Sequence, residues 1–82
     1  MRSSLDILEE IRATLSAKKL IAEKAELDTE IRASSTADEL CLRSAEKLLS
    51  LQKQHPEVKN AIGHLISEFT DLCHTMGLFP KE

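Results

Sequence analysis

Three polar residues in the last third of the chain have a spacing that could support chemistry. His64, Glu68 and Asp71 lie four and three positions apart, so an α-helix would place them along one side. An imidazole beside two carboxylates can bind a divalent metal ion or act in general acid–base catalysis. That side of the helix is the polar one, however, and no second group of ligand residues accompanies it. We therefore interpret the three residues as a solvent-exposed face, and we keep a small metal-dependent helical enzyme as the alternative.

The two cysteines do not form a recognisable catalytic or zinc-binding motif. Cys73 and His74 are adjacent, so in a helix their side chains point about 100° apart and cannot form a nucleophile–base pair. Neither Cys41 nor Cys73 has the spacing of a zinc motif, and the chain has no glycine-rich phosphate loop and no nucleophile turn. We predict that both cysteines are buried apolar residues. We also predict that the protein uses no metal or other cofactor and is not an enzyme.

The composition indicates one folded domain over residues 1–82. Hydrophobic residues make up 41% of the chain, which is more than disordered chains usually contain, and the 2% of aromatic residues implies an aliphatic core. The net charge of −3 and the lack of a basic cluster argue against a nucleic-acid partner. No apolar run reaches the ~20 residues of a membrane-spanning helix, and the first residues lack the apolar stretch of a signal peptide. We predict a cytoplasmic protein that binds neither nucleic acid nor membrane.

The elements that must position these residues begin with one long helix. Residues 1–55 contain neither Gly nor Pro. Ser3 and Ser4 are suited to cap a helix start, and acidic residues follow in the first turns, where the helix dipole favours them. Good helix formers then continue to Ala33. The sequence predicts a helix over residues 4–33.

The apolar side of this long helix changes partway along. Up to Leu15 the apolar residues lie on one side, whereas three later ones lie on nearly the opposite side: Leu20, Leu27 and Ile31. Either the helix breaks near residues 16–19, or a continuous helix buries different faces against different neighbours. We predict the continuous helix, because residues 16–19 include no helix-breaking residue type. One short chain offers few partners for both faces, which indicates a second chain.

The second helix is predicted over residues 37–54. Thr36 and Glu39 have the spacing of a capping box, in which the hydroxyl and the carboxylate each accept a backbone N–H at the helix start. The alternative is that residues 34–36 form a polar patch within one very long helix. The apolar positions of residues 37–54 cover a wide arc, so we expect this helix to contact more than one neighbour.

The third helix is predicted over residues 56–76, followed by a short tail over residues 77–82. Pro56 suits the first turn of a helix. Gly77 suits a left-handed end of the Schellman type, with Leu78 packed back on Cys73, and Pro80 prevents the helix from resuming. Six apolar residues at alternating spacings of four and three form the predicted bundle core: Val58, Ile62, Leu65, Phe69, Leu72 and Met76.

The end of the third helix resembles part of a known family. The sequence LISEFTDLCHTMGLFPK, from Leu65 to Lys81, is similar to the C-terminal helix of quorum-sensing antiactivators of the TraM type, and Ala45 to Leu48 is similar to a segment of an earlier helix. Proteins of this type are small, helical and dimeric, and they sequester a transcription activator. The resemblance implies a sequestering protein of this class and assigns no functional residues, and residues 1–33 do not share it.

Together these patterns predict an all-α fold, a small helical bundle of two to three helices. The long first helix packs against an antiparallel hairpin made by the other two. The apolar faces exceed what such a bundle can bury, which predicts a homo-oligomer, most simply a dimer. We expect a non-enzymatic protein–protein interaction module that binds or sequesters a partner protein, as a regulator, adaptor or secretion-type chaperone does. Five residues are predicted to form its partner or oligomer interface: Leu20, Leu27, Ile31, Leu78 and Phe79.

Overall fold

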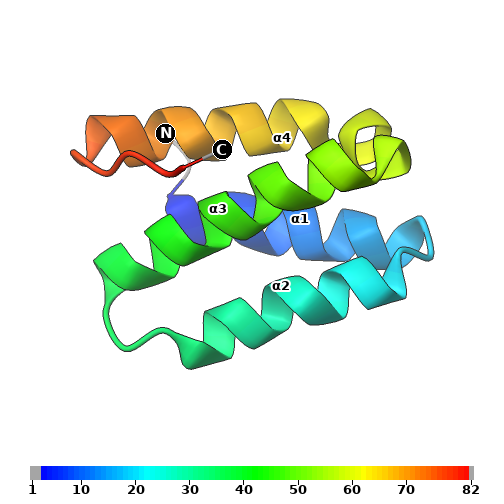
Figure 1. Ribbon diagram of the computed structural model, residues 1–82, viewed down its shortest axis with the longest axis horizontal. Helices are drawn as coiled ribbons and strands as arrows, with labels where there is room; N and C mark the ends of the chain where they lie inside the picture. The colour runs from blue at the N-terminus through cyan, green and yellow to red at the C-terminus, as the bar shows by residue number, and fades with distance from the viewer. Residues whose placement is uncertain (1–2, 82) are drawn as a thin grey trace.

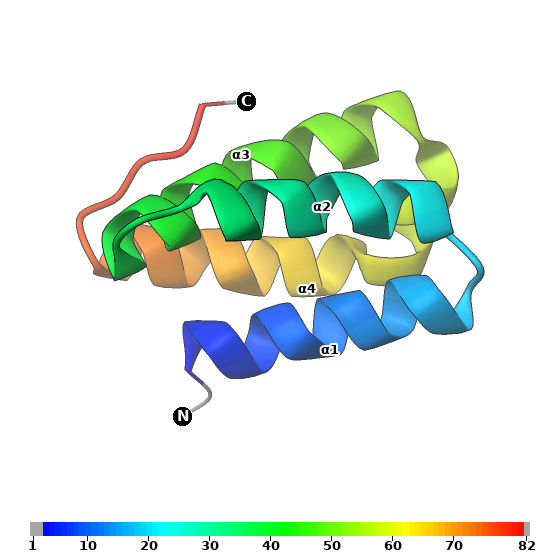
Figure 2. The ribbon, with the colours of Figure 1, turned by 90° about the horizontal axis from the view of Figure 1, so that it is seen from below.

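A computed structural model of the chain describes residues 3–81, and over this range it contains four α-helices and no strand. The helices are α1 (Ser4–Ala17), α2 (Ile21–Ala33), α3 (Ala37–Gln54) and α4 (Pro56–Thr75). Each helix runs antiparallel to the next, and α4 packs against α1 to close the bundle (Figures 1 and 2). The all-α class is therefore confirmed, with four helices where two or three were predicted. Met1, Arg2 and Glu82, at the ends of the predicted domain and tail, lie outside the described residues.

The prediction of one helix over residues 4–33 is wrong, because the chain reverses direction at Lys18–Leu20. Lys19 has a left-handed backbone with φ of 62°. The Leu20 N–H donates to the Leu15 carbonyl at 2.8 Å, and the Lys19 N–H donates to the Ser16 carbonyl at 3.0 Å. These two bonds define a Schellman end in which lysine occupies the position usually taken by glycine. The reversal turns both apolar sides of the predicted long helix toward one core.

Side-chain caps explain where two of the helices begin. At α1, the Ser3 hydroxyl accepts the Asp6 N–H at 3.2 Å and the Asp6 carboxylate accepts the Ser3 N–H at 3.3 Å, which is a complete capping box. At α3, the Thr36 hydroxyl accepts the Glu39 N–H at 3.1 Å. The Glu39 carboxylate accepts the N–H of Ser35 rather than that of Thr36, at 3.3 Å. Residues 34–36 therefore separate two helices and do not form a polar patch within one.

The end of α4 has the geometry that the sequence predicts, one residue early. The Leu78 N–H donates to the Cys73 carbonyl at 2.8 Å and the Gly77 N–H to the His74 carbonyl at 3.0 Å. Gly77 has φ of 82°, and Leu78 packs against the core. The predicted Schellman end is thus confirmed. It is the same motif that ends α1, with Gly77 in the position of Lys19.

The core contains apolar residues from all four helices, and α4 contributes the most. Four of the predicted core residues are buried in it, namely Val58, Ile62, Leu65 and Phe69. Leu72 is half-buried at the edge of the core. The prediction that Met76 is a core residue is wrong, because the residue is 43% exposed. It lies beyond the last turn of α4 as the C-cap residue, where the chain leaves the helix axis.

The helix α2 has the smallest share of the core. Within α2, all of which the structure describes, Leu27 is the one fully buried residue, and Ile31 is half-buried. Ion pairs join α2 to α1 and α3 on its two sides: Arg12 Nε–Asp28 Oδ1 at 2.7 Å, Arg43 Nε–Glu30 Oε1 at 3.3 Å and Lys47 Nζ–Glu26 Oε1 at 3.7 Å. Partly exposed ion pairs contribute little free energy each, so α2 is the least strongly held of the four helices.

Across residues 3–81, no helix has both the length and the apolar character required to cross a bilayer.

Candidate functional site

The three residues first considered for catalysis do not come together as a site. His64, Glu68 and Asp71 are all exposed on α4. His64 and Asp71 line an open hollow between α3 and α4, and Glu68 is not part of its lining. Within residues 3–81, their ligand atoms do not form a group close enough to share a metal ion. The alternative of a metal-dependent enzyme built on these three residues gains no support from the geometry.

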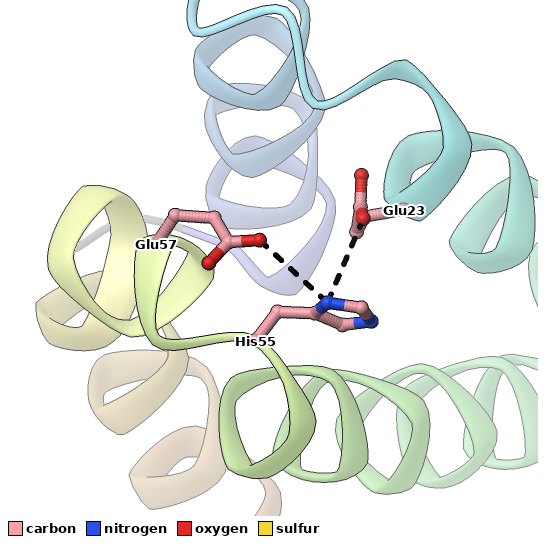
Figure 3. A group of neighbouring side chains, drawn as sticks. All are labelled: Glu23, His55 and Glu57. Atoms are coloured by element: carbon pink, nitrogen blue, oxygen red, sulfur yellow. Dashed lines mark ion pairs between the residues drawn. The ribbon is translucent and has the colours of Figure 1, made fainter.

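A different group of side chains does converge, at the end of the bundle where α1 turns into α2 and α3 meets α4. It consists of Glu23, His55 and Glu57, which we call the His55 cluster (Figure 3). His55 Nδ1 lies 3.9 Å from Glu23 Oε2 and 3.6 Å from Glu57 Oε1. One ligand atom from each residue lies within 4.8 Å of those of the other two. The group therefore presents one imidazole nitrogen and two carboxylates to a common point.

The backbone of His55 is fixed on both sides. Its N–H donates to the Leu51 carbonyl at 2.8 Å, which ends α3, and its own carbonyl accepts the Val58 N–H at 3.0 Å, which begins α4. Pro56 follows directly and restricts the backbone further. The backbone from which the imidazole side chain extends is thus fixed by hydrogen bonds to α3 and α4. The ring points from the junction toward α2 (Figure 3).

The two carboxylates come from the first turns of two helices. Glu23 lies in the first turn of α2 and Glu57 in the first turn of α4, where the helix dipoles favour negative charge. The Glu23 side chain is 15% exposed, whereas that of Glu57 is more than half exposed. The cluster therefore has one protected side, made by Glu23, and one side open to solvent, made by Glu57.

Sequence reasoning missed this cluster because Glu23 is far from His55 and Glu57 in the chain. Glu23 is separated from His55 by most of α2 and all of α3. His55 is visible in the sequence as the residue before Pro56, which predicts a helix boundary and no chemistry. The break at Lys19 is what brings the start of α2 to the α3–α4 junction, and lysine carries no signal for such a break.

The five residues predicted to form an interface have different environments. Leu27 is fully buried within this chain, so its assignment to an interface is corrected. Three others are half-buried and pack against the core: Leu20, Ile31 and Leu78. Phe79 is 71% exposed. Residues from both apolar sides of residues 4–33 thus pack within one chain, and Phe79 is the most exposed of the five.

The segment that carries Phe79 is held in place at several points. The Phe79 ring stacks on the His74 ring, with centroids 5.4 Å apart and planes inclined by 28°. Leu78 packs on the core just before it, and the Lys81 N–H donates to the Glu46 carboxylate of α3 at 3.2 Å. The tail runs back along the bundle on the α3 side (red in Figures 1 and 2). We refer to Met76 and Phe79, the exposed apolar residues of this end, as the tail surface.

The two cysteines lie in the core. Both are buried, free thiols, as the sequence predicts. The Cys73 thiol donates to the Cys41 carbonyl, with the sulfur 3.7 Å from the oxygen. Burial, and to a smaller extent the neighbouring Cys41, raises the pKa of Cys73 to about 11. Since the thiolate is the nucleophilic form, Cys73 is held in its unreactive state.

Comparisons of the chain with known proteins found no matching family model, no matching curated protein and no matching solved structure. The resemblance of residues 65–81 to the TraM-type antiactivators therefore remains an expectation from sequence.

Proposed function

We propose that this chain is a non-enzymatic protein-binding module that inserts Phe79 into an apolar pocket of a partner protein. The observation that supports this proposal is the position of Phe79, which is 71% exposed although the segment that carries it is held by several contacts. Phenylalanine is usually buried, and aromatic residues are enriched in protein–protein interfaces.

Burial of Phe79 in a partner's pocket would contribute a considerable free energy of binding for one residue. Full burial of a Phe side chain contributes about 1.5–3 kcal/mol relative to exposure. Aromatic anchors of this kind dominate many protein interfaces. The contacts of Leu78 and Lys81 hold the segment before binding, so less conformational entropy is lost when a partner binds.

The partner is proposed to be a different protein rather than a second copy of the chain. The sequence argument for a dimer rested on the two-sided helix of residues 4–33, and residues from both of its apolar sides pack in the core of one chain, although Leu5 and Ile21 are each 57% exposed. The tail surface consists of two apolar residues, Met76 and Phe79. A stable dimer buries about 800 Å² on each partner, far more than two side chains supply. A small anchored contact fits a regulator or adaptor that binds reversibly.

The test compares Phe79→Ala with Leu5→Ala, which removes another exposed apolar side chain, from α1. Partners captured from the source cells by the wild-type chain are identified and purified, and their dissociation constants are measured for all three chains. We expect Phe79→Ala to weaken binding at least tenfold and Leu5→Ala to change it less than twofold. Because both side chains are exposed, both variants should retain the wild-type melting temperature.

Two results would contradict the proposal. In one, the purified partner binds the Phe79→Ala chain as tightly as the wild type. In the other, sedimentation at micromolar concentration shows a stable dimer that Phe79→Ala dissociates, which would make a second copy of the chain the occupant of the tail surface.

A further inference from the structure

We propose that the His55 cluster binds one divalent transition-metal ion of the Zn²⁺ type, and that the bound ion fixes α2 to the α3–α4 junction. This inference does not depend on the proposed function. It rests on the convergence on one point of Glu23 from the start of α2 with His55 and Glu57 from the α3–α4 junction (Figure 3).

The distances fit such an ion better than they fit direct pairing. A charge-assisted N–H···O bond is about 2.7–2.9 Å long, but His55 Nδ1 lies 3.6 Å and 3.9 Å from the two carboxylate oxygens. The nitrogen thus faces both carboxylates and is hydrogen-bonded to neither. Ligand atoms at about 2.0–2.1 Å from a tetrahedral Zn²⁺ ion are about 3.3 Å apart. The two distances from His55 Nδ1 are close to that separation, and all three ligand atoms lie within 4.8 Å of one another, so side-chain rotations would bring them around an ion.

The donor set selects the class of metal. A neutral imidazole nitrogen with two carboxylate oxygens suits zinc and its neighbours among the transition metals. Ca²⁺ and Mg²⁺ prefer sites made of oxygen ligands. Two carboxylates also neutralise the charge of a divalent ion. Three protein ligands leave a fourth position for water on the open side of the cluster, where Glu57 is exposed.

Two of the three ligands are well placed before any ion binds. The His55 backbone is held by hydrogen bonds to Leu51 and Val58, so little rearrangement of the junction is needed. The Glu23 side chain is 15% exposed, which weakens the competition from water for its carboxylate. Glu57 is the exposed ligand, and its side chain would rotate to reach the ion.

The structural consequence falls on α2. This helix buries one residue fully and is otherwise joined to its neighbours by partly exposed ion pairs. An ion held by Glu23 on one side and by His55 and Glu57 on the other would cross-link the start of α2 to α3 and α4. Because the ligands converge only in the folded bundle, binding would stabilise the fold.

The experiment uses the full chain, stripped of metal with a chelator and then dialysed. Zn²⁺ is titrated by calorimetry into the wild type, His55→Ala and Glu57→Gln, with His64→Ala and His74→Ala as matched controls that remove other surface imidazoles. The His55 side chain makes no cap hydrogen bond and Glu57 is exposed, so both site variants should fold, which circular dichroism verifies. Ca²⁺ and Mg²⁺ are titrated in parallel.

We expect one Zn²⁺ per wild-type chain, affinity at least tenfold weaker in both site variants, and unchanged affinity in both controls. At a free Zn²⁺ concentration ten times the dissociation constant, the wild-type melting temperature should rise by roughly 5–10 °C. Amide hydrogen exchange should slow in α2 more than in the other helices. The site variants should show neither change.

Three outcomes would overturn the inference. In the first, Zn²⁺ is bound with equal affinity by the wild type and by both site variants, which would indicate an adventitious ion only. Loss of binding in His64→Ala or His74→Ala would place the site elsewhere. Tight binding by the His55 cluster without added protection of α2 would refute the cross-link.

Discussion

The left-handed residue between α1 and α2 gives the sharpest test of the fold. Lys19 is an exposed L-residue with φ of 62°, at the position where the motif that ends α4 has Gly77. A left-handed conformation costs an L-residue about 1–2 kcal/mol, because its Cβ approaches the following carbonyl oxygen. Replacement by glycine removes that cost but adds about 0.4–1 kcal/mol of unfolded-state entropy. We expect Lys19→Gly to stabilise the chain by about 0.5–1 kcal/mol.

The matched substitution in the second motif should have the opposite sign. Gly77 has φ of 82°, and a Cβ placed there would meet no atom within 4 Å. The cost of Gly77→Ala is therefore conformational and not steric. We expect a loss of stability of about 0.5–1 kcal/mol, from the same two terms with their signs reversed.

The assays are urea unfolding and thermal unfolding of both variants and the wild type, each monitored by circular dichroism. For a chain of 82 residues, the two changes correspond to shifts in melting temperature of roughly 3–6 °C, upward for Lys19→Gly and downward for Gly77→Ala. If Lys19 were instead inside one continuous helix over residues 4–33, glycine there would destabilise the chain by about 1 kcal/mol. A destabilised Lys19→Gly chain would thus refute the break between α1 and α2.

Two further predictions concern polar groups within the bundle. Burial raises the pKa of Asp28, but hydrogen bonds from Arg12 and Lys24 outweigh this effect and hold it below 3.8. The stabilisation is then present above about pH 4 and lost as the pH falls through the lowered pKa, so Asp28→Asn should cost about 1 kcal/mol at pH 7 and progressively less below pH 4 in urea unfolding. A cost independent of pH would contradict this reasoning. Ser44 is fully buried, and within residues 3–81 its hydroxyl has no hydrogen-bond partner. Ser44→Ala should therefore raise the free energy of unfolding by about 1 kcal/mol. A free energy of unfolding below that of the wild type would indicate that a buried water hydrogen-bonds to the hydroxyl.

Much of the fold could be predicted from residues whose side chains act locally. The Thr36 cap, Pro56 and Gly77 each determine a boundary through their own chemistry, and the apolar spacing of residues 58–69 identifies the buried side of α4. The break at Lys19 could not be predicted in this way. It is imposed by the gain from burying Leu15 and Leu27 in one core, a tertiary effect that overrides the local preference of lysine.

The same break explains why the His55 cluster was not predicted while exposed candidates were. His64, Glu68 and Asp71 are close in sequence, so helical spacing alone brings them to one side. Glu23 and His55 become neighbours only when α2 folds back along the bundle, which a continuous first helix would prevent. Met76 was wrongly predicted as a core residue for the opposite reason. Its spacing continues the apolar pattern of residues 58–72, but α4 ends one residue before it.

The packing of α1 against α4 has a consequence for how the chain folds. Three of the four pairs of packed helices are neighbours in sequence and are joined by very short turns, so these pairs can assemble early with little loss of chain entropy. The pairing of α1 with α4 joins the two ends of the chain, and it closes a loop that contains both other helices. We expect this closure to be the slowest step of folding and to set its rate.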